Sequence, residues 1–424
     1  MVYKFGGVSI RDAERIKSVA NIISNANKPI VVVISAMGKT TNALEEVVKQ
    51  YFADHTASIS SFRKIVNDHI KVAQDLGLTA EKYLESINEL IVSVEWLLEV
   101  EPEDSFDYVY DQVVSVGELM STKLMNEYLV HIGVNSKWQD IRDVLLTSDQ
   151  YRDPKVDWEK TQKNVLSIIQ TDLEKFNVIV TQGFIGSTPD NNTTTLGREG
   201  SDYTGAILSY CLNADKYTIW KDVEGVLTGD PKKFENVSKL DRLSYAEAIE
   251  MTYYGAKVIH PKTIKPLQNK SIPLEVRSFI ESTKNGTVVS SDMDIKLPPI
   301  VVLEPNQALI HFSTNDFSFI AENHLKEIFA ALASHRLKVN LMRNTAISFS
   351  ICVNNIDDRI TKLVSELESI YSISVEKGLE LITIRHYNDS IIQNLKADKM
   401  VLFEEKLEKM IQMVVKEIPL MARK

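Results

Sequence analysis

The sequence TTTLGREGSDYTG contains residues that could bind an anionic group. Gly197 and Gly200 let the backbone approach a ligand closely or adopt a positive φ. Between them, Arg198 presents a planar guanidinium, which suits a carboxylate or a phosphate. The amphipathic stretch that follows predicts a helix, with Ser201 as its N-cap and Asp202 in its first turn. The pattern fits an anion-binding loop at a helix N-terminus, and it also fits a capped helix whose arginine is solvated.

A second candidate lies in the string YKFGGVS near the beginning of the chain. Lys4 stands at the end of a short predicted strand, and Gly6 and Gly7 follow it before a predicted helix. An ammonium group and backbone N–H groups can converge there on phosphate oxygens. The string is not a G-x-x-x-x-G-K-[ST] loop. Taken alone, it also fits an ordinary turn between a strand and a helix.

Two further motifs follow in the second half of the chain. The string KDVEGVLTGDP places Asp222 and Gly225 in a turn at the carboxyl end of a predicted strand. In the string YYGAKVIHPKT, Lys257 lies just after Gly255, two residues along the chain, and Pro261 stands at the first position of a predicted helix. His260 is interpreted as a structural residue at that helix entrance.

Composition limits the classes of protein to consider. The chain has 424 residues, of which 44% are apolar and 25% charged, enough for a large core and two or three domains. A net charge of −10 and a pI of about 5.5, without a basic block, make nucleic acid an unexpected partner. Cys211 and Cys352 are far apart and have no metal-like spacing. Because we find no signal peptide and no apolar run of about 18 residues, we expect a soluble cytoplasmic protein.

The elements that position these motifs alternate between strands and helices. Residues 1–40 read as strand, loop, helix and buried strand, and residues 41–131 read as a helical lobe. Alternation resumes after the lobe and includes a capping box at Ser244 and Glu247. The pattern predicts an α/β fold with a mostly parallel sheet.

The pair Pro298 and Pro299 predicts a domain boundary, because two prolines break a regular element. We therefore expect a first domain over 1–298 and a second region over 300–424. The order after the boundary, β-α-β-β-α-β over about 305–378, is ferredoxin-like. An abbreviated second copy over about 379–424 closes with the amphipathic segment FEEKLEKMIQMVVKE.

Taken together, the motifs resemble the aspartate kinases of the amino-acid kinase family. The matching strings are KFGG, VVVISAMGKTTN, VGELMS, GFIGS, TTTLGREGSDYTG, DVEGVLTGDP and EAIEMTYYGAKVIHP, with a paired C-terminal ACT-type tail. The resemblance covers nearly the whole chain. It implies a three-layer αβα sandwich with ferredoxin-like ACT domains. The implied activity is the ATP-dependent phosphorylation of the β-carboxylate of L-aspartate to 4-phospho-L-aspartate, the first step of lysine, threonine and methionine biosynthesis. The sequence has no second G-x-G-x-x-G βαβ unit, so we do not expect a fused homoserine dehydrogenase.

The resemblance also implies roles for single residues. Lys4 would neutralise charge on the transferred phosphoryl group, and Asp202 would orient Lys4. Arg198 would bind the α-carboxylate of aspartate, and Glu118 in VGELMS would bind its α-ammonium group. The remaining residues of the implied aspartate pocket are Ser35, Thr41 and Ser201.

The implied nucleotide contacts lie in three glycine-containing segments. They are Lys4, Gly6, Gly7, Lys221, Asp222, Gly225, Lys232 and Lys257. Mg²⁺ would be held mainly by ATP phosphates and water, so no protein metal cage is expected. The sequence departs from the frequent family pattern at Val8, Glu199, Lys221, Leu227 and Lys232.

The tail implies regulation and assembly. Its resemblance to lysine-sensitive relatives makes lysine the first expected effector and threonine the second. The expected effector segments are 313–325 and 338–351, and a homodimer through the ACT region is expected. Three alternatives stay open: another kinase of the superfamily such as a glutamate or carbamate kinase, a non-catalytic amino-acid sensor, and a tail that only dimerises.

Overall fold

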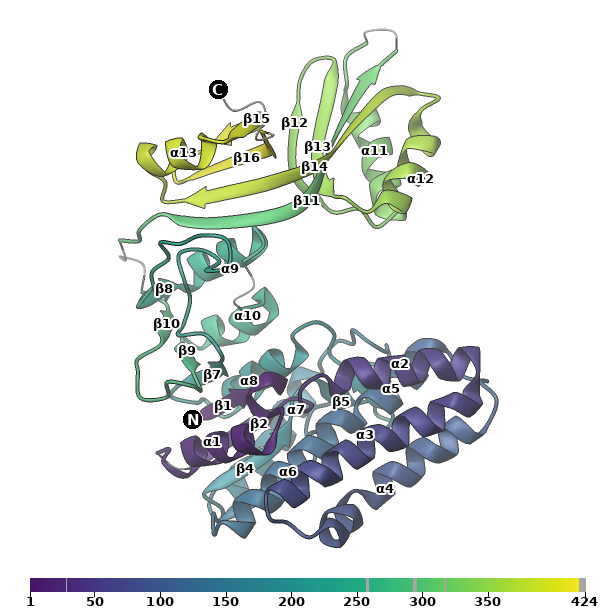
Figure 1. Cartoon of the computed structure of the whole chain (residues 1–424), viewed down its shortest axis with the longest axis vertical. Coiled ribbons are helices and arrows are strands. Elements are labelled where there is room, and N and C mark those ends of the chain that lie inside the picture. The colour runs from purple at the N-terminus through teal and green to yellow at the C-terminus, as the bar shows by residue number, and fades with distance from the viewer. Residues whose placement is uncertain (28, 257–258, 293–295, 316–317, 419–424) are drawn as a thin grey trace. The chain divides into compact units, whose positions relative to one another are not determined.

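A computed structural model describes residues 1–27, 29–256, 259–292, 296–315 and 318–418. Within these residues the chain forms two compact units, whose elements are labelled in Figure 1. The first unit comprises Met1–Val226, Lys239–Ile249 and Val258–Ile295. The second unit comprises Leu227–Ser238, Glu250–Lys257 and Lys296–Lys424. The boundary predicted near residue 298 is therefore not a single cut in the chain: two short segments before it cluster with the C-terminal unit.

The first unit is built on a mostly parallel sheet. Among the described residues it has eight strands, in the spatial order β3 (Ser136–Gln139), β4 (Val178–Gln182), β2 (Ile30–Ile34), β1 (Val2–Phe5), β7 (Tyr217–Lys221), β9 (Leu274–Ser278), β10 (Thr287–Ser290) and β8 (Arg242–Ser244). Neighbours run parallel except β9 and β10. The inner strand β2 is apolar throughout and fully buried, as expected of a strand whose two faces are both covered.

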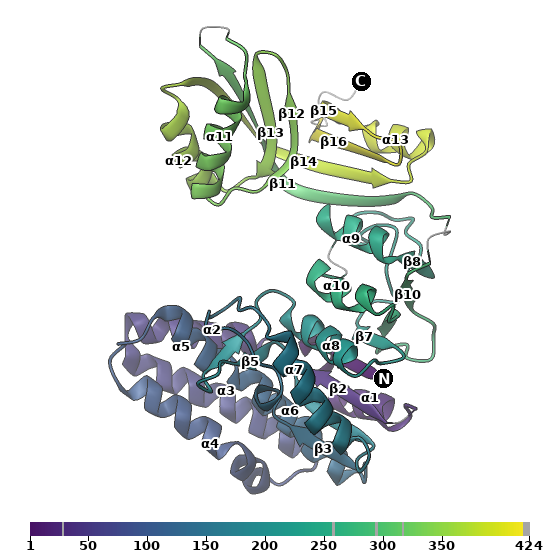
Figure 2. The ribbon, with the colours of Figure 1, turned by 180° about the vertical axis from the view of Figure 1, so that it is seen from behind.

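Helices cover both faces of this sheet. Figure 1 shows α1 (Ala13–Ser24) and α6 (Val116–His131) on one face, and Figure 2 shows α7 (Trp158–Asn164) and α8 (Gly200–Cys211) on the other. The expected three-layer α/β sandwich is thus confirmed. The remaining elements are η1 (Gly7–Ile10), η2 (Ile141–Asp143), π-helical η3 (Val165–Gln170), α9 (Tyr245–Tyr253), α10 (Pro261–Asn269) and the hairpin of β5 (Ile185–Ser187) and β6 (Thr193–Thr195). In the described part of the chain, no helix is both long enough and apolar enough to span a membrane.

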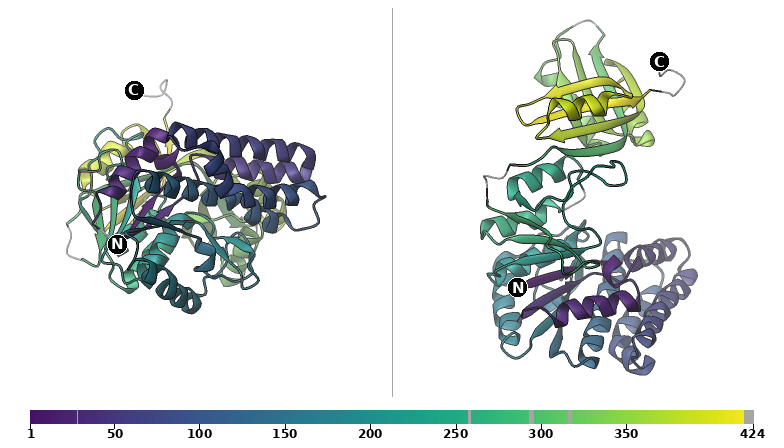
Figure 3. Two further views of the ribbon diagram at one scale, coloured as in Figure 1. Left: turned by 90° about the horizontal axis from the view of Figure 1, so that it is seen from below. Right: turned by 60° about the vertical axis from the view of Figure 1, so that its left-hand side comes forward.

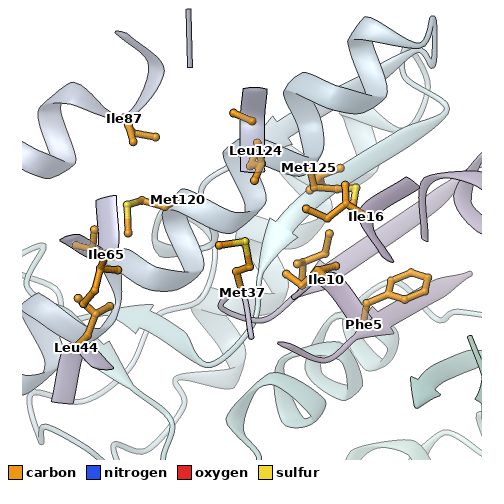
Figure 4. Packing of buried hydrophobic residues seen from close by; sticks show 14 of the residues in the cluster. Phe5, Ile10, Ile16, Met37, Leu44, Ile65, Ile87, Met120, Leu124 and Met125 are labelled. Atoms are coloured by element: carbon orange, nitrogen blue, oxygen red, sulfur yellow. The ribbon is translucent and has the colours of Figure 1, made fainter. Parts of the chain in front are cut away.

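The segment expected to be a helical lobe folds into long helices. They are α2 (Thr40–Ala53), α3 (His55–Asp75), α4 (Ala80–Glu99) and α5 (Phe106–Val114), followed by α6. Figure 4 shows Leu44, Ile65 and Ile87 of the lobe near Met120 and Leu124 of α6, in one cluster that continues to β1. The lobe and the sheet therefore share one hydrophobic core.

The second unit contains an antiparallel sheet. Its described strands number six, in the order β12 (Val339–Asn344), β13 (Ser348–Asn354), β11 (Ile300–Thr314), β14 (Tyr371–Arg385), β16 (Met410–Glu417) and β15 (Lys399–Lys406). The helices are α11 (Glu322–Ser334), α12 (Asp357–Leu367) and α13 (Asp389–Lys396). The first four strands with α11 and α12 have the ferredoxin-like order expected from the sequence.

The two halves of this sheet are joined by its two longest strands. β11 and β14 each extend through both halves, and the right-hand view of Figure 3 shows the yellow C-terminal strands continuing that sheet. Ile300–Glu304 pairs with the second half of β14 and so takes the fourth-strand place of the second copy. The amphipathic segment that closes this copy forms the end of β15 and the whole of β16. Within this segment, β16 pairs with β14. Its apolar residues belong to two hydrophobic clusters that also contain residues of β14.

Candidate active site

A cavity of about 560 Å³ lies at the carboxyl edge of the parallel sheet. Loops that follow β1, β2, β4 and β7 converge there, because parallel strands end at the same edge. Most of the residues selected from the sequence line this cavity. They are Lys4, Gly6, Gly7, Ser35, Thr41, Glu118, Arg198, Ser201, Asp202, Lys221 and Asp222.

A buried ion pair forms the floor of the cavity. The Lys4 Nζ atom at the end of β1 lies 2.6 Å from Oδ1 of Asp202, in the first turn of α8. Lys221 Nζ lies 3.8 Å from the other carboxylate oxygen. Burial alone would raise the pKa of Asp202, but the charges of Lys4 and Lys221 outweigh it and hold the pKa below its usual value. Asp202 is therefore a carboxylate that holds two ammonium groups at the cavity.

The loops that form the cavity wall approach each other too closely for side chains. A Cβ at Gly7 would lie 2.6 Å from the carbonyl oxygen of Ala36, and a Cβ at Gly183 would lie 2.5 Å from Ser201. The Gly38 N–H group also donates to the Gly7 carbonyl at 3.0 Å. These contacts hold the loop after β1 against the loop after β2, and the loop after β4 against the first turn of α8, so the backbone at the cavity is fixed by packing.

Glu118 on α6 places a carboxyl group in the cavity wall with little solvent contact. The Ala36 N–H group donates to its Oε1 atom at 3.3 Å, and its buried Oε2 atom has no hydrogen-bond partner among the described residues. Burial raises the pKa of Glu118 to about 8, although the Ala36 N–H group and the Lys4 charge lower it. A buried acceptor of this kind is suited to a cationic ligand group.

Arg198 lies at the exposed rim of the cavity, on the loop before α8. Gly197 has a φ of 72° and Glu199 a φ of 55°, so the loop turns through the left-handed region at two positions. The expectation that Ser201 caps α8 is wrong: the helix begins at Gly200, the N-cap is Glu199, and no side chain caps it. Two left-handed residues start the helix earlier than the Ser-Asp pattern indicates, and Ser201 lines the cavity from inside the first turn.

Three residues inferred as nucleotide contacts are not among the described lining residues of this cavity, each for a different reason. Gly225 has a φ of 154°, and a Cβ there would lie 2.4 Å from Thr287 Oγ1, so packing requires this glycine. Lys232, like Leu227, belongs to the second unit, and its N–H group donates to Asp230. Lys257 lies outside the described residues.

Sequence reasoning missed several residues of the lining. They are Ser9, Asn42, Glu45, Tyr110, Arg152, Phe184, Thr195, Trp220 and Phe279, while Val8 and Glu199 were noted only as departures. Some are neighbours of identified motif residues, such as Trp220 before Lys221. Arg152 and Tyr110 come from loops and helices with no chemical motif, so only the fold places them here.

Comparisons with known proteins show the family of this chain. Residues 1–278 match the amino acid kinase family. Lysine-sensitive aspartokinase 3 of Escherichia coli (strain K12) is 32% identical over 400 residues, which cover 91% of this chain and 86% of that protein. The E. coli aspartokinase III complex with lysine and aspartate has a TM-score of 0.83 at 29% identity, and the complex with aspartate and ADP has 0.80 at 28%. Each structure aligns over 98% of this chain and 95% of the other.

The fold and the cavity define an α/β enzyme of the phosphotransferase class. The chain belongs to the amino acid kinase family, and within it to the aspartokinases. The resemblance inferred from the sequence motifs is confirmed.

The buried ion pair predicts a stability effect. Replacing Lys4 by Met leaves Asp202 with only the more distant Lys221, so we expect a loss on the order of 3 kcal/mol. The midpoint of urea unfolding at neutral pH measures it. Lys221→Met is the matched control and should cost less, because that contact is longer and more exposed. Equal midpoints for wild type and Lys4→Met would show that the pair does not stabilise the fold.

Proposed function

We propose that this protein transfers the γ-phosphoryl group of ATP to the β-carboxylate of L-aspartate, which gives 4-phospho-L-aspartate. The supporting observation is that one cavity combines three complementary groups: the guanidinium of Arg198, the buried carboxyl of Glu118 and the ion pair of Lys4 and Asp202. These match the α-carboxylate, the α-ammonium group and the transferred phosphoryl group of the reactants. The E. coli structure in complex with aspartate and ADP supports the same pair of reactants.

The reaction needs positioning and charge more than proton transfer. The β-carboxylate of aspartate is ionised at neutral pH, so it attacks the phosphoryl group without a general base. The main barrier is the approach of one anion to another, and cationic groups lower it. Lys4 meets the charge that develops on the transferred phosphoryl group, and Asp202 orients Lys4. Ser35, Thr41 and Ser201 complete the aspartate pocket in this proposal.

We also propose that ATP binds on the side of Gly6, Gly7, Lys221 and Asp222. The loop of Gly6 and Gly7 offers backbone N–H groups before η1, and Lys221 adds a cation held by Asp202. Mg²⁺ would supply further charge neutralisation here, and Asp222 is one of the lining carboxylates that could help to hold it. Gly225, Lys232 and Lys257 stay in this proposal as contacts inferred from the motif.

An acyl-phosphate assay tests the proposed activity. The purified chain with ATP, Mg²⁺ and L-aspartate should give aspartyl hydroxamate when hydroxylamine is present. Glutamate and carbamate in place of aspartate should give no comparable product. If no acceptor gives a product, the result would favour a non-catalytic amino-acid sensor. A preference for glutamate or carbamate would favour another kinase of the superfamily.

Replacing Arg198 by Lys should raise the KM for aspartate about 10-fold or more and leave the KM for ATP nearly unchanged. A lysine cannot reproduce the two parallel hydrogen bonds of a guanidinium on the α-carboxylate. Steady-state kinetics measure both constants. The control is Arg242→Lys, an exposed arginine outside the cavity lining. A larger effect on ATP than on aspartate would contradict the assignment of Arg198.

Glu118 predicts a pH dependence of aspartate binding. Its pKa of about 8 means that the carboxyl is mostly neutral at pH 7 and ionised above pH 8. Because the ionised form pairs with the α-ammonium group, the KM for aspartate should fall as the pH rises through 8. The KM for ATP should not change in the same way over this pH range. In Glu118→Gln, the KM for aspartate should be high and independent of pH. A wild-type KM that is flat between pH 7 and 9 would contradict this role.

We propose that the catalytic domain is 1–298, with its helical lobe at about 41–131, and that 300–424 forms two ACT-type units that join two copies of the chain. The first ACT-type unit is about 305–378, and the second ACT-type unit is about 379–424. The support is the ferredoxin-like order of the first ACT-type unit, whose edge strand β12 exposes Met342. An unpaired edge strand can add a strand from another copy. We place the protein in the cytoplasm.

Lysine is the proposed effector, and threonine is the second choice. The E. coli relative is lysine-sensitive, and its structure holds lysine. In this chain the Ile320 N–H group donates to the Ala346 carbonyl at 2.9 Å, which joins the two expected segments. Residues 316–317 lie outside the described residues. Ala321 is the N-cap of α11 and its own N–H group donates to His324 Nδ1 at 3.2 Å, so we propose that the N–H groups of the following first turn bind the ligand carboxylate.

Lysine should inhibit with a coupling of about 1–3 kcal/mol, seen as a 5- to 150-fold rise in the KM for aspartate at saturation. Activity is titrated with lysine, with threonine and with both. Ala321→Glu should weaken the lysine response without changing the uninhibited KM, because its carboxylate competes for the same N–H groups. Flat titrations with both amino acids would leave the region as a dimerisation module only.

A further inference from the structure

Asp111 of α5 is a buried carboxylate that belongs to none of the motifs. Both of its oxygens accept hydrogen bonds from other parts of the chain: Oδ2 from the N–H groups of Arg152 and Thr195 at 2.9 Å, and Oδ1 from the Thr195 hydroxyl at 2.6 Å. The side chain of the next residue, Gln112, donates to the Thr193 carbonyl at 2.9 Å and accepts from the Thr193 N–H group at 3.2 Å. The two side chains thus form hydrogen bonds with backbone groups of β6, as the backbone of a neighbouring strand would.

The segments that Asp111 holds lead directly to the cavity. Thr195 lines the cavity, and Arg198 follows it by three residues. Arg152 also lines the cavity and has a φ of 68°, a left-handed conformation that is unfavourable for arginine unless its surroundings fix it. A Cβ at Gly197 would lie 3.0 Å from the Arg152 carbonyl, so the two loops are in contact.

We propose that Asp111 is a positioning residue, which holds the loop of Arg198 and the loop of Arg152 in the geometry that binds the substrate carboxylate. The inference rests on the proposed function, because it uses Arg198 as the carboxylate-binding group. Asp111 touches neither substrate in this proposal. It acts through the Thr195 backbone, which fixes where the following loop begins, and through Arg152, which supports Gly197 from the other side.

The charge of Asp111 strengthens this arrangement. Burial raises the pKa of its carboxyl to about 6, although its hydrogen bonds from Thr195 and Arg152 and the Arg152 charge lower it. The carboxylate is therefore mostly ionised at neutral pH, and its hydrogen bonds are charge-assisted. The Arg152 side chain stays near by, stacked on the ring of Tyr110 at 4.3 Å and paired with Asp107.

The test is the kinetics of Asp111→Ala. The substitution leaves two buried N–H groups without an acceptor, so the loops should relax, and the KM for aspartate should rise about 10-fold or more. The KM for ATP should change less than about twofold, because Lys4 and Lys221 do not depend on these loops. Asp111→Asn should restore most of the affinity, since its amide oxygen accepts both N–H groups and its NH₂ group can donate to the Thr195 hydroxyl.

The control is Asp157→Ala, which removes a carboxylate that accepts a backbone N–H group outside the cavity, at the N-terminus of α7. It should leave both KM values unchanged. If Asp111→Ala does not fold, Asp111→Asn carries the test with a rise of a few-fold confined to aspartate. Equal rises for both substrates, or a loss of stability with unchanged KM values, would overturn the inference. An inactive wild type would overturn the proposed function instead.

Discussion

The ion pair between Lys4 and Asp202 is the interaction on which the site depends. It joins the central strand β1 to the first turn of α8, and it is buried at the edge where the parallel strands end. Without Lys4, the Asp202 carboxylate would be an expensive buried charge, and without Asp202 two ammonium groups would repel each other. The same pair thus stabilises the contact of helix with sheet and holds the positive charge that phosphoryl transfer requires.

The parts of the cavity are held at different degrees of rigidity. Close backbone contacts at Gly7 and Gly183 fix the cavity wall beside the buried ion pair of Lys4 and Asp202. The rim is different: Arg198 is exposed, and the N–H group of Thr195, three residues before it, donates to Asp111 of the helical lobe. The lobe therefore contacts the cavity lining at Thr195 as well as sharing a core with the sheet.

Motif residues next to buried strands were predictable from the sequence. Lys4, Asp202 and Lys221 could be assigned to one site because each adjoins a strand end or a helix start, and such ends meet at one edge of a parallel sheet. Gly225 could not be judged in this way, since a glycine needed for packing against Thr287 looks the same in sequence as one needed by a ligand. Ser201 was misjudged as a cap because its pattern says nothing about the left-handed turn at Glu199.

The sequence alone determined the fold class, the family and the chemical inventory of the site, because local periodicity and short charged motifs are written in neighbouring residues. Only the tertiary structure decided how Asp111 serves Thr195 and Arg152, which are distant in sequence and carry no motif. It also decided that Ile300–Glu304 completes the second half of the C-terminal sheet. Both depend on long-range backbone hydrogen bonds, whose partners are set by the packing of whole elements.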